Sequence, residues 1–557
     1  RAALGALARG VVGMPARDKA LVDALVFRYD DGRNGTVFAA HRKELEARYA
    51  TAMEAVAEES PDCHMQFLAA EAWLLTVWWR GDLGAFAKPE PAVARAMRLL
   101  RAATKQQPGH PGVLRLRALV SERWPQRSSR SEARELADGL ERALPGAPEL
   151  LHLAARQRVR LDDYEGALLV QRRAVALAQW QVFPLHHLEA LVFILRARGM
   201  MGEAQQAARQ LVGLAVQHLQ SDTWEMGSTA DRYIAHSVLT LLLRGDFNAV
   251  FRAPQPPWIS LFVRGVWHFA RGMAHAGLGH LSGAEKEAAA LWAAPFALEE
   301  QLRVHPGKYG RLPVKAICEV YSLILGDAVE RLKQPEWPTG VQDLRRAVRL
   351  ADGLPYDELP VFYLAPRLFL GEALLRGGDA FGAREAFGRE LAVGSPFGPF
   401  ALFGLREACE ALAVRDANTT AASAAPSSVE RCAQSAAARF AAGWEEADVG
   451  LQRPTQAVQL APALGSASLS SRSSSHRRSA GELPGWPPSF GAAGVAALAL
   501  AGFAALGLLG GALSHLLPQE ELGARYLPVG SSGAVEEAAH SDGSSPRGGD
   551  PRDGPLE

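Results

Sequence analysis

The chain has 557 residues, and its 60 basic and 60 acidic residues cancel, so no overall field favours nucleic acid or an anionic substrate. Alternating runs of β-branched and polar residues are scarce, which favours an all-α protein. The 4 cysteines are far apart and form no CxxC pair, so they indicate neither a disulfide framework nor a zinc site. We expect no nucleic-acid partner.

Residues 18–413 form a succession of predicted helices separated by Gly, Pro and Asp turns. The clearest unit is His152–Ala178, in which small and apolar residues recur every three or four positions on both sides of the turn Asp162-Asp163-Tyr164. This pattern is typical of two amphipathic helices packed against each other. Because neither helix can bury its apolar face alone, the unit predicts neighbours of the same kind.

The same pattern recurs along the chain, with a small residue early in the second helix of each pair. The clear copies are anchored at Ala167, Ala204, Ala284 and Ala383, which are separated by 37, 80 and 99 residues, so the spacing is irregular. The repeat-defining positions are Asp162, Tyr164, Ala167, Gly199, Ala204, Gly272, Ala284, Gly371, Gly378 and Ala383. They predict an irregular α-solenoid of tetratricopeptide (TPR)-like helix pairs.

The composition changes after residue 413. Residues 414–485 are rich in Ala, Ser, Gly and Pro and are expected to be a disordered linker, with a short helix around 428–444 as an alternative. Phe490–Leu513 carries no charged side chain, and a helix of its length rises about 36 Å, enough to cross a hydrocarbon core of about 30 Å. We expect one transmembrane helix there, followed by a disordered acidic tail at 518–557. Small residues in the span predict a weak homodimer through it.

Charges on either side of the span predict its orientation. Arginines at 472, 477 and 478 precede it, and Glu520 and Glu521 follow it. By the positive-inside rule, the helical body of this single-pass membrane protein is expected to face the cytosol. The alternative is a soluble structural repeat protein in which the Ala/Gly-rich segment is only low in complexity.

The sequence has no phosphate-binding loop, HExxH helix or GxSxG elbow, so we expect no catalytic, cofactor or metal residue and no enzyme. Arginines within the helices are interpreted chiefly as solvated helix faces, with a concave face lined by cations for an acidic peptide or a C-terminal carboxylate as the alternative. The histidines are interpreted as core or groove side chains. The candidate ligand-facing residues are Arg115, His152, Arg156, His187, His268 and His275. The rival hypothesis is an enzyme with a metal or acid/base site, which requires at least three groups to converge. The groups concerned are His152, His187, His268, His275, Asp163 and Glu189.

Several segments occur in an order that is itself specific. They are Gln107-Pro108-Gly109-His110-Pro111-Gly112, the stretch 161–167 (LDDYEGA), 266–272 (VWHFARG), 354–358 (LPYDE), 370–375 (LGEALL) and 400–405 (FALFGL). Together they resemble a family of uncharacterised, mostly bacterial TPR-repeat proteins over roughly residues 18–413. The resemblance implies a TPR superhelix and no established reaction.

This chain departs from that family at its histidines. Relatives have further histidines after the HPG segment and before the LDDY-like turn. Here Arg115 and Leu116 follow the first, and the stretch 153–156 (LAAR) replaces much of the second. The resemblance therefore implies that any site formed by those histidines is degraded here, with His152 as a remnant. Our prediction is a membrane-anchored TPR-like scaffold or adaptor that binds a protein or peptide in its concave groove.

Overall fold

The computed structural model describes residues 14–29, 35–78, 91–124, 129–178, 185–220, 224–255, 261–304, 313–334, 340–354, 357–393, 395–417 and 428–448. All of them belong to the first of two compact units, residues 1–464. The predicted membrane span 490–513 and tail 518–557 lie outside the described residues. Among the helices described, none is both long and apolar enough to cross a membrane.

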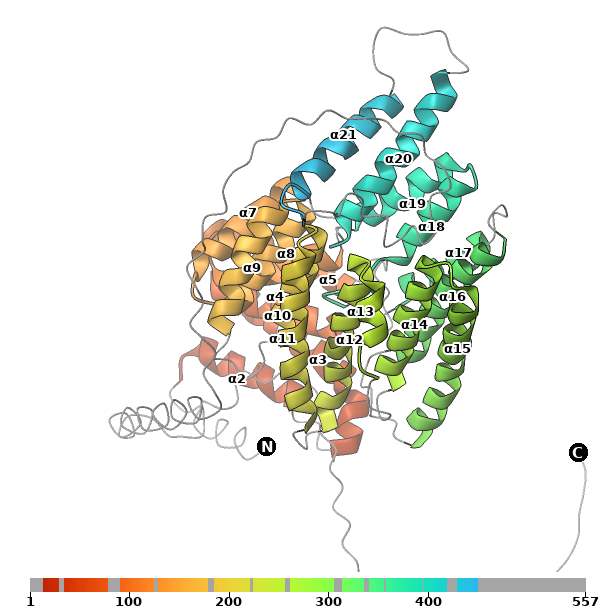
Figure 1. The fold of residues 1–557 in the computed structure, drawn as a ribbon. Helices are drawn as coiled ribbons and strands as arrows, with labels where there is room; N and C mark the ends of the chain where they lie inside the picture. Colours follow the sequence, from red (N-terminus) through yellow and green to blue (C-terminus); the bar gives the residue numbers. More distant parts are fainter. Residues whose placement is uncertain are drawn as a thin grey trace, which may run out of the picture. The chain divides into compact units, whose positions relative to one another are not determined.

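The described residues form helices and turns but no strand (Figure 1). The helices are α2 Ala16–Tyr29, α3 Gly35–Glu59, α4 Cys63–Trp78, α5 Pro91–Gln106, α6 Pro111–Arg123, α7 Arg130–Ala143, α8 Pro148–Arg160, α9 Tyr164–Ala178, α10 Leu185–Ala197, α11 Met201–Gln220, α12 Trp224–Arg244, α13 Phe247–Arg252, α14 Leu261–Gly277, α15 Leu281–Val304, α16 Val314–Lys333, α17 Val341–Asp352, α18 Pro366–Arg376, α19 Ala380–Ala392, α20 Gly398–Ala417 and α21 Ser428–Gly443. Most pack chiefly against the helices next to them in the chain. This confirms an all-α body of neighbouring helix pairs, an arrangement consistent with an α-solenoid.

Local sequence signals explain where many helices begin. Proline occupies the first turn of α6, α8 and α18, where its missing N–H costs no hydrogen bond. The side chains of Ser129, Asp246 and Asp379 accept hydrogen bonds from the backbone N–H three residues on, at the starts of α7, α13 and α19. These caps satisfy donors that the first helical turn leaves free.

Five helix pairs share one turn geometry. A residue with positive φ ends the first helix, and a buried residue follows five positions later in the second. The pairs are Asp162 and Ala167, Gly199 and Ala204, Gly245 and Val250, Gly279 and Ala284, and Gly378 and Ala383. In each turn the next backbone N–H bonds the carbonyl five residues back, which is the pattern of a left-handed helix cap. Asp162 is the one non-glycine among the described positive-φ residues.

Two other repeat glycines lie where helices approach closely. A Cβ at Gly272 would lie 2.5 Å from Leu325 Cδ2, and one at Gly371 would lie 2.5 Å from Phe387 Cζ. A Cβ at either position would displace the neighbouring side chain, so these glycines let Leu325 and Phe387 pack directly against helix backbone. Tyr164 is also buried, at the first position of α9.

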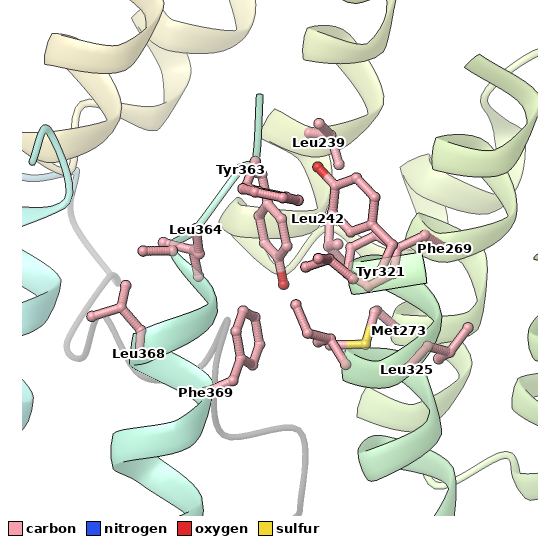
Figure 2. Packing of buried hydrophobic residues seen from close by; sticks show 14 of the residues in the cluster. Leu239, Leu242, Phe269, Met273, Tyr321, Leu325, Tyr363, Leu364, Leu368 and Phe369 are labelled. Carbon is pink, nitrogen blue, oxygen red and sulfur yellow. The ribbon is translucent and has the colours of Figure 1, made fainter. Parts of the chain in front are cut away.

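A short non-helical segment, residues 357–365, fills the core of the second half of the array. Figure 2 shows Tyr363 and Leu364 of this segment between side chains of α12, α14 and α16 on one side and α18 on the other. Tyr321 of α16 donates a hydrogen bond to the carbonyl of Val361 at 3.2 Å. The segment therefore joins helices α12–α16 to the helices that follow it.

The last two helices reach into residues 414–485, for which the sequence predicts a disordered linker. α20 continues to Ala417, and α21, Ser428–Gly443, matches the alternative of a short helix around 428–444. A disulfide joins Cys409 to Cys432, so the prediction of no disulfide is wrong, whereas Cys63 and Cys318 are free and buried. The two bonded cysteines are 23 residues apart in sequence, and only the antiparallel pairing of α20 with α21 brings them together.

The C-terminal end of α21 returns to turns near the middle of the chain (Figure 1). Arg439 pairs with Asp162 at 2.7 Å, and Arg198 pairs with Glu446 at 2.6 Å. Asp448 accepts a hydrogen bond from the Gly202 N–H at 2.7 Å and donates one to the Gly199 carbonyl at 3.1 Å. Segments more than 240 residues apart in sequence are thereby fastened together.

We predict that Gly199→Ala destabilises the protein more than Gly245→Ala. Both glycines have positive φ, so alanine at either should cost about 1–2 kcal/mol of backbone strain. A Cβ at Gly199 would also lie 2.7 Å from Ala447 Cβ and from the Trp444 ring, whereas Gly245 has open space. Urea unfolding followed by circular dichroism measures the difference. Equal losses in the two variants would show that the contacts of Trp444 and Ala447 with this turn contribute nothing to stability.

Candidate functional site

Two helices bring a group of histidines and a carboxylate together. Glu149 and His152 are three residues apart on α8, so they lie on the same face of that helix. His186 and His187 occupy the first turn of α10. We call these four residues the α8–α10 cluster.

Contacts within the cluster centre on Glu149. Its Oε2 lies 3.3 Å from His186 Nε2, and its Oε1 lies 3.3 Å from His187 Nε2. The centroids of the two histidine rings are 3.9 Å apart. The His152 ring meets both edge-on, at 5.3 Å from His186 and 5.1 Å from His187. One carboxylate thus faces two imidazoles, with a third beside them.

Hydrogen bonding in the cluster is incomplete. His187 is fully buried, yet neither of its ring nitrogens has a hydrogen-bond partner, because the 3.3 Å approach to Glu149 is not aligned for one. His152 is also buried, and its Nε2 lacks a hydrogen-bond partner. Buried polar atoms without partners carry a free-energy cost, so native structures keep few of them.

Gln171 of α9 orients the buried histidines. Its side-chain N–H₂ donates to the His187 carbonyl at 2.8 Å, which leaves its Oε1 as the acceptor 3.1 Å from His152 Nδ1. His152 Nδ1 therefore carries the proton, and Nε2 of the neutral ring presents a lone pair. The Nε2 atom lies 3.9 Å from Glu358 Oε2.

Electrostatics favour a charged His186–Glu149 pair. The neighbouring imidazoles of His186 and His187 hold the pKa of Glu149 well below its usual range. Burial lowers the pKa of His186, but the hydrogen bond and charge of Glu149 outweigh it, and the net pKa is raised. Burial lowers the pKa of His152. The cluster therefore holds a neutral histidine next to an ion pair.

The segment 357–365 brings carboxylates to the same region. Glu358 Oε1 lies 3.1 Å from Arg156 Nη1 of α8, and Arg156 also pairs with Glu122 of α6. Asp357 pairs with Arg232 of α12, whose Nη2 donates to the Leu359 carbonyl at 2.8 Å. Arg156 holds the pKa of Glu358 well below its usual range. Adjacent carboxylates of one non-helical segment thus engage arginines from two different helices.

Arg232 is itself held by a buried carboxylate. Its Nε donates to Glu189 Oε1 of α10 at 2.7 Å, and His236 Nε2 lies 2.8 Å from the same oxygen. Burial raises the pKa of Glu189, but Arg232 and His236 oppose it, and the net pKa is lowered. Glu189 is therefore a buried, ionised carboxylate that holds the Arg232 side chain in place.

Three of the candidate ligand-facing residues, His152, Arg156 and His187, lie together in this region. Among the groups on which the enzyme hypothesis depends, Glu189 pairs with Arg232, and Asp163 pairs with an arginine of α8 while capping α9. His152 and His187 are the two members of that set that the structure brings into the α8–α10 cluster.

The remaining candidates lie elsewhere. Arg115 is exposed on α6 and forms no ion pair with any residue that the structure describes. His268 and His275 lie on α14 and face α15, where His268 Nδ1 is 2.7 Å from Glu287 Oε2. The His275 ring packs against Phe251, with centroids 4.5 Å apart. These histidines serve helix packing rather than the α8–α10 cluster.

Sequence reasoning missed Glu149, Glu358 and Arg232 and left His186 out of the candidates. The Glu-x-x-His spacing of Glu149 and His152, on one helix face, was a usable signal. Glu358 gave none, because its partner Arg156 is more than 100 residues away, and Arg232 gave none, because its partners Glu189 and Asp357 are 43 and 125 residues away.

In comparisons with known proteins, no protein-family model and no curated protein matches the chain.

Proposed function

We propose that the protein is a TPR-type helical scaffold that binds acidic, non-helical segments of a partner polypeptide. The observation that supports this most directly is the way the array holds its own segment 357–365. Arginines of α8 and α12 pair with two successive carboxylates, and side chains of α12 and α16 donate to backbone carbonyls of the segment. Pairing of clustered arginines with acidic motifs is one of the recurring modes of peptide recognition.

Charge and exposure indicate where a partner would bind. Asp357 and Glu358 keep 41% and 48% of their side-chain surface exposed, whereas Arg232 and Arg156 keep 13% and 10%, so a partner reaches the arginines only by displacing the two carboxylates. The rest of the segment is different, because Tyr363 and Leu364 are buried in the core. A partner would therefore replace the two carboxylates and leave the buried part of the segment in place.

A competition experiment tests this proposal. We expect Asp357→Asn/Glu358→Gln to bind a synthetic peptide containing Asp-Glu-Leu about tenfold more tightly than the wild type, which corresponds to about 1.4 kcal/mol. The reason is that the internal competitor for Arg156 and Arg232 is weakened. Fluorescence anisotropy of a labelled peptide measures the affinity.

Two controls define the specificity of that result. A peptide with Asn-Gln-Leu should bind neither protein, and Glu385→Gln, which removes an exposed charge on α19, should behave as the wild type. The proposal fails if the double variant binds acidic and neutral peptides equally, or if it binds neither.

The proposed scaffold is held at a membrane by Phe490–Leu513, whose sequence is long and apolar enough to span a bilayer. Carbonate extraction tests this, because release of the full-length chain into the supernatant would exclude the anchor. Two signals on orientation oppose each other. Arginines before the span favour a cytosolic body, whereas a disulfide such as Cys409–Cys432 is typical of oxidising compartments. Protease protection in sealed vesicles distinguishes the two.

A further inference from the structure

A metal site is the most specific chemistry that the α8–α10 cluster supports, and it is independent of peptide binding. Glu149, His186 and His187 each offer one ligand atom, and these atoms all lie within 4.8 Å of one another. Two imidazoles and a carboxylate are the donors found in many zinc and iron sites. We propose that these three residues bind a divalent transition-metal ion, with Zn²⁺ as the preferred ion.

The observed distances suit this ligand set. With metal–ligand bonds of about 2.0–2.2 Å, neighbouring donors in a tetrahedral site lie about 3.3–3.6 Å apart. Each of the two Glu149 oxygens is already 3.3 Å from the Nε2 of one histidine. Small side-chain rotations are enough for one carboxylate oxygen and both Nε2 atoms to share an ion.

The unpartnered imidazole of His187 is an independent observation that points to a ligand. His187 is fully buried, and both of its ring nitrogens lack hydrogen bonds. A metal bound at Nε2 would use the lone pair that no protein donor satisfies. The backbone of His187 is fixed by the hydrogen bond that Gln171 donates to the His187 carbonyl.

Access for the ion comes from the opposite side. The side chains of His186 and Glu149 are 31% and 56% exposed, so the buried histidine lies below two ligands that solvent reaches. Three protein ligands leave a coordination position for water or for a group from a partner. His152 is a positioning residue beside the site, because its ring packs edge-on against both ligand histidines.

The donor set also predicts which ions bind. Imidazole nitrogens suit zinc, cobalt, nickel and iron, whereas magnesium and calcium prefer all-oxygen sites. Free thiols take no part in the cluster, since Cys63 lies on α4 and Cys318 on α16. The site should therefore bind Zn²⁺ and Co²⁺ and should not bind Mg²⁺ at comparable concentration.

The test uses the untagged full-length chain in detergent, stripped with a chelator and titrated with ZnCl₂, CoCl₂ or MgCl₂. We expect one equivalent of Zn²⁺ or Co²⁺ by calorimetry, visible absorption bands from bound Co²⁺, and no binding of Mg²⁺. Glu149→Gln and His186→Asn should each weaken Zn²⁺ binding at least tenfold, about 1.4 kcal/mol, while keeping the wild-type circular dichroism spectrum.

His275→Gln is the matched control, because it removes a histidine from another helix pair and should leave the affinity unchanged. The proposal is overturned if the wild type binds no Zn²⁺, since the cluster is then only a histidine–carboxylate ion pair. It is also overturned if the α8–α10 variants bind as tightly as the wild type, or if His275→Gln weakens binding equally. Either of the last two results would place the bound metal elsewhere.

Discussion

Replacing Arg232 with methionine is expected to lower the free energy of unfolding by about 3–5 kcal/mol, because it removes one partner from a buried ion pair. Glu189 is 2% exposed and accepts from Arg232 Nε at 2.7 Å. Methionine replaces much of the volume of the arginine but leaves that carboxylate with only His236, whose pKa is lowered by burial, as its remaining side-chain partner. The carboxylate of Asp357 and the carbonyl of Leu359 lose their donor as well.

The dependence of this loss on pH follows from Glu189. In the wild type its pKa lies below the ordinary value of 4.5, so it contributes stability above that pH and loses it as the pH falls through the lower folded value. Without Arg232, burial raises the pKa of Glu189, and the folded state becomes less stable wherever unfolded Glu189 is ionised. The deficit of Arg232→Met should therefore shrink as the pH is lowered from 7 toward 4.5.

Urea unfolding across that pH range measures both effects, and Arg389→Met provides the control. Arg389 is 65% exposed and lies 4.0 Å from Glu385, so its loss should change stability by no more than about 0.5 kcal/mol. A deficit for Arg232→Met as small as that of the control, or one independent of pH, would contradict the role assigned to the Glu189 pair.

The helical architecture could be predicted because its signals are local. A residue that ends a helix with positive φ must be glycine or a tolerant residue such as aspartate, so the turns at Gly199, Gly378 and Asp162 are visible in the sequence. The small residues five positions later are also visible in the sequence, because each must fit where two helices cross. Local sequence thus indicates the units of the array.

The way the units close on one another could not be predicted. The return of α21 to the Gly199 turn depends on contacts such as Arg439 with Asp162, between residues 277 positions apart. An exposed helix face and a face that meets a distant turn have the same composition. The Cys409–Cys432 disulfide was missed for the same reason, because spacing alone does not show that two helices pair.

The site was partly predictable in the same sense. His152, Arg156 and His187 were identified as polar residues on otherwise apolar helices, which is a local signal. His152 contacts Gln171 of α9 within its own helix pair, whereas Glu358, the partner of Arg156, comes from the distant non-helical segment 357–365. A buried polar side chain requires a partner, but the sequence does not state which distant residue provides it.

Tyr363 provides the second large effect and tests whether segment 357–365 is part of the core. Its side chain is 1% exposed, with ring centroids 5.6 Å from Phe269 and 6.1 Å from Phe369 (Figure 2). Tyr363→Ala removes an aromatic ring from a packed interior and should lower the free energy of unfolding by about 3–5 kcal/mol. Urea unfolding followed by circular dichroism measures it.

Tyr363→Phe separates packing from the hydroxyl group. The buried Tyr363 hydroxyl has no hydrogen-bond partner, and burial raises its pKa well above the usual value, so it contributes no satisfied polar contact. Removing it while keeping the ring should leave stability unchanged or raise it by about 1 kcal/mol. A large loss for Tyr363→Phe would mean that the hydroxyl is hydrogen-bonded in solution. A small loss for Tyr363→Ala would mean that the segment is not packed into the core, and Asp357 and Glu358 would then lose the support that aims them at Arg232 and Arg156.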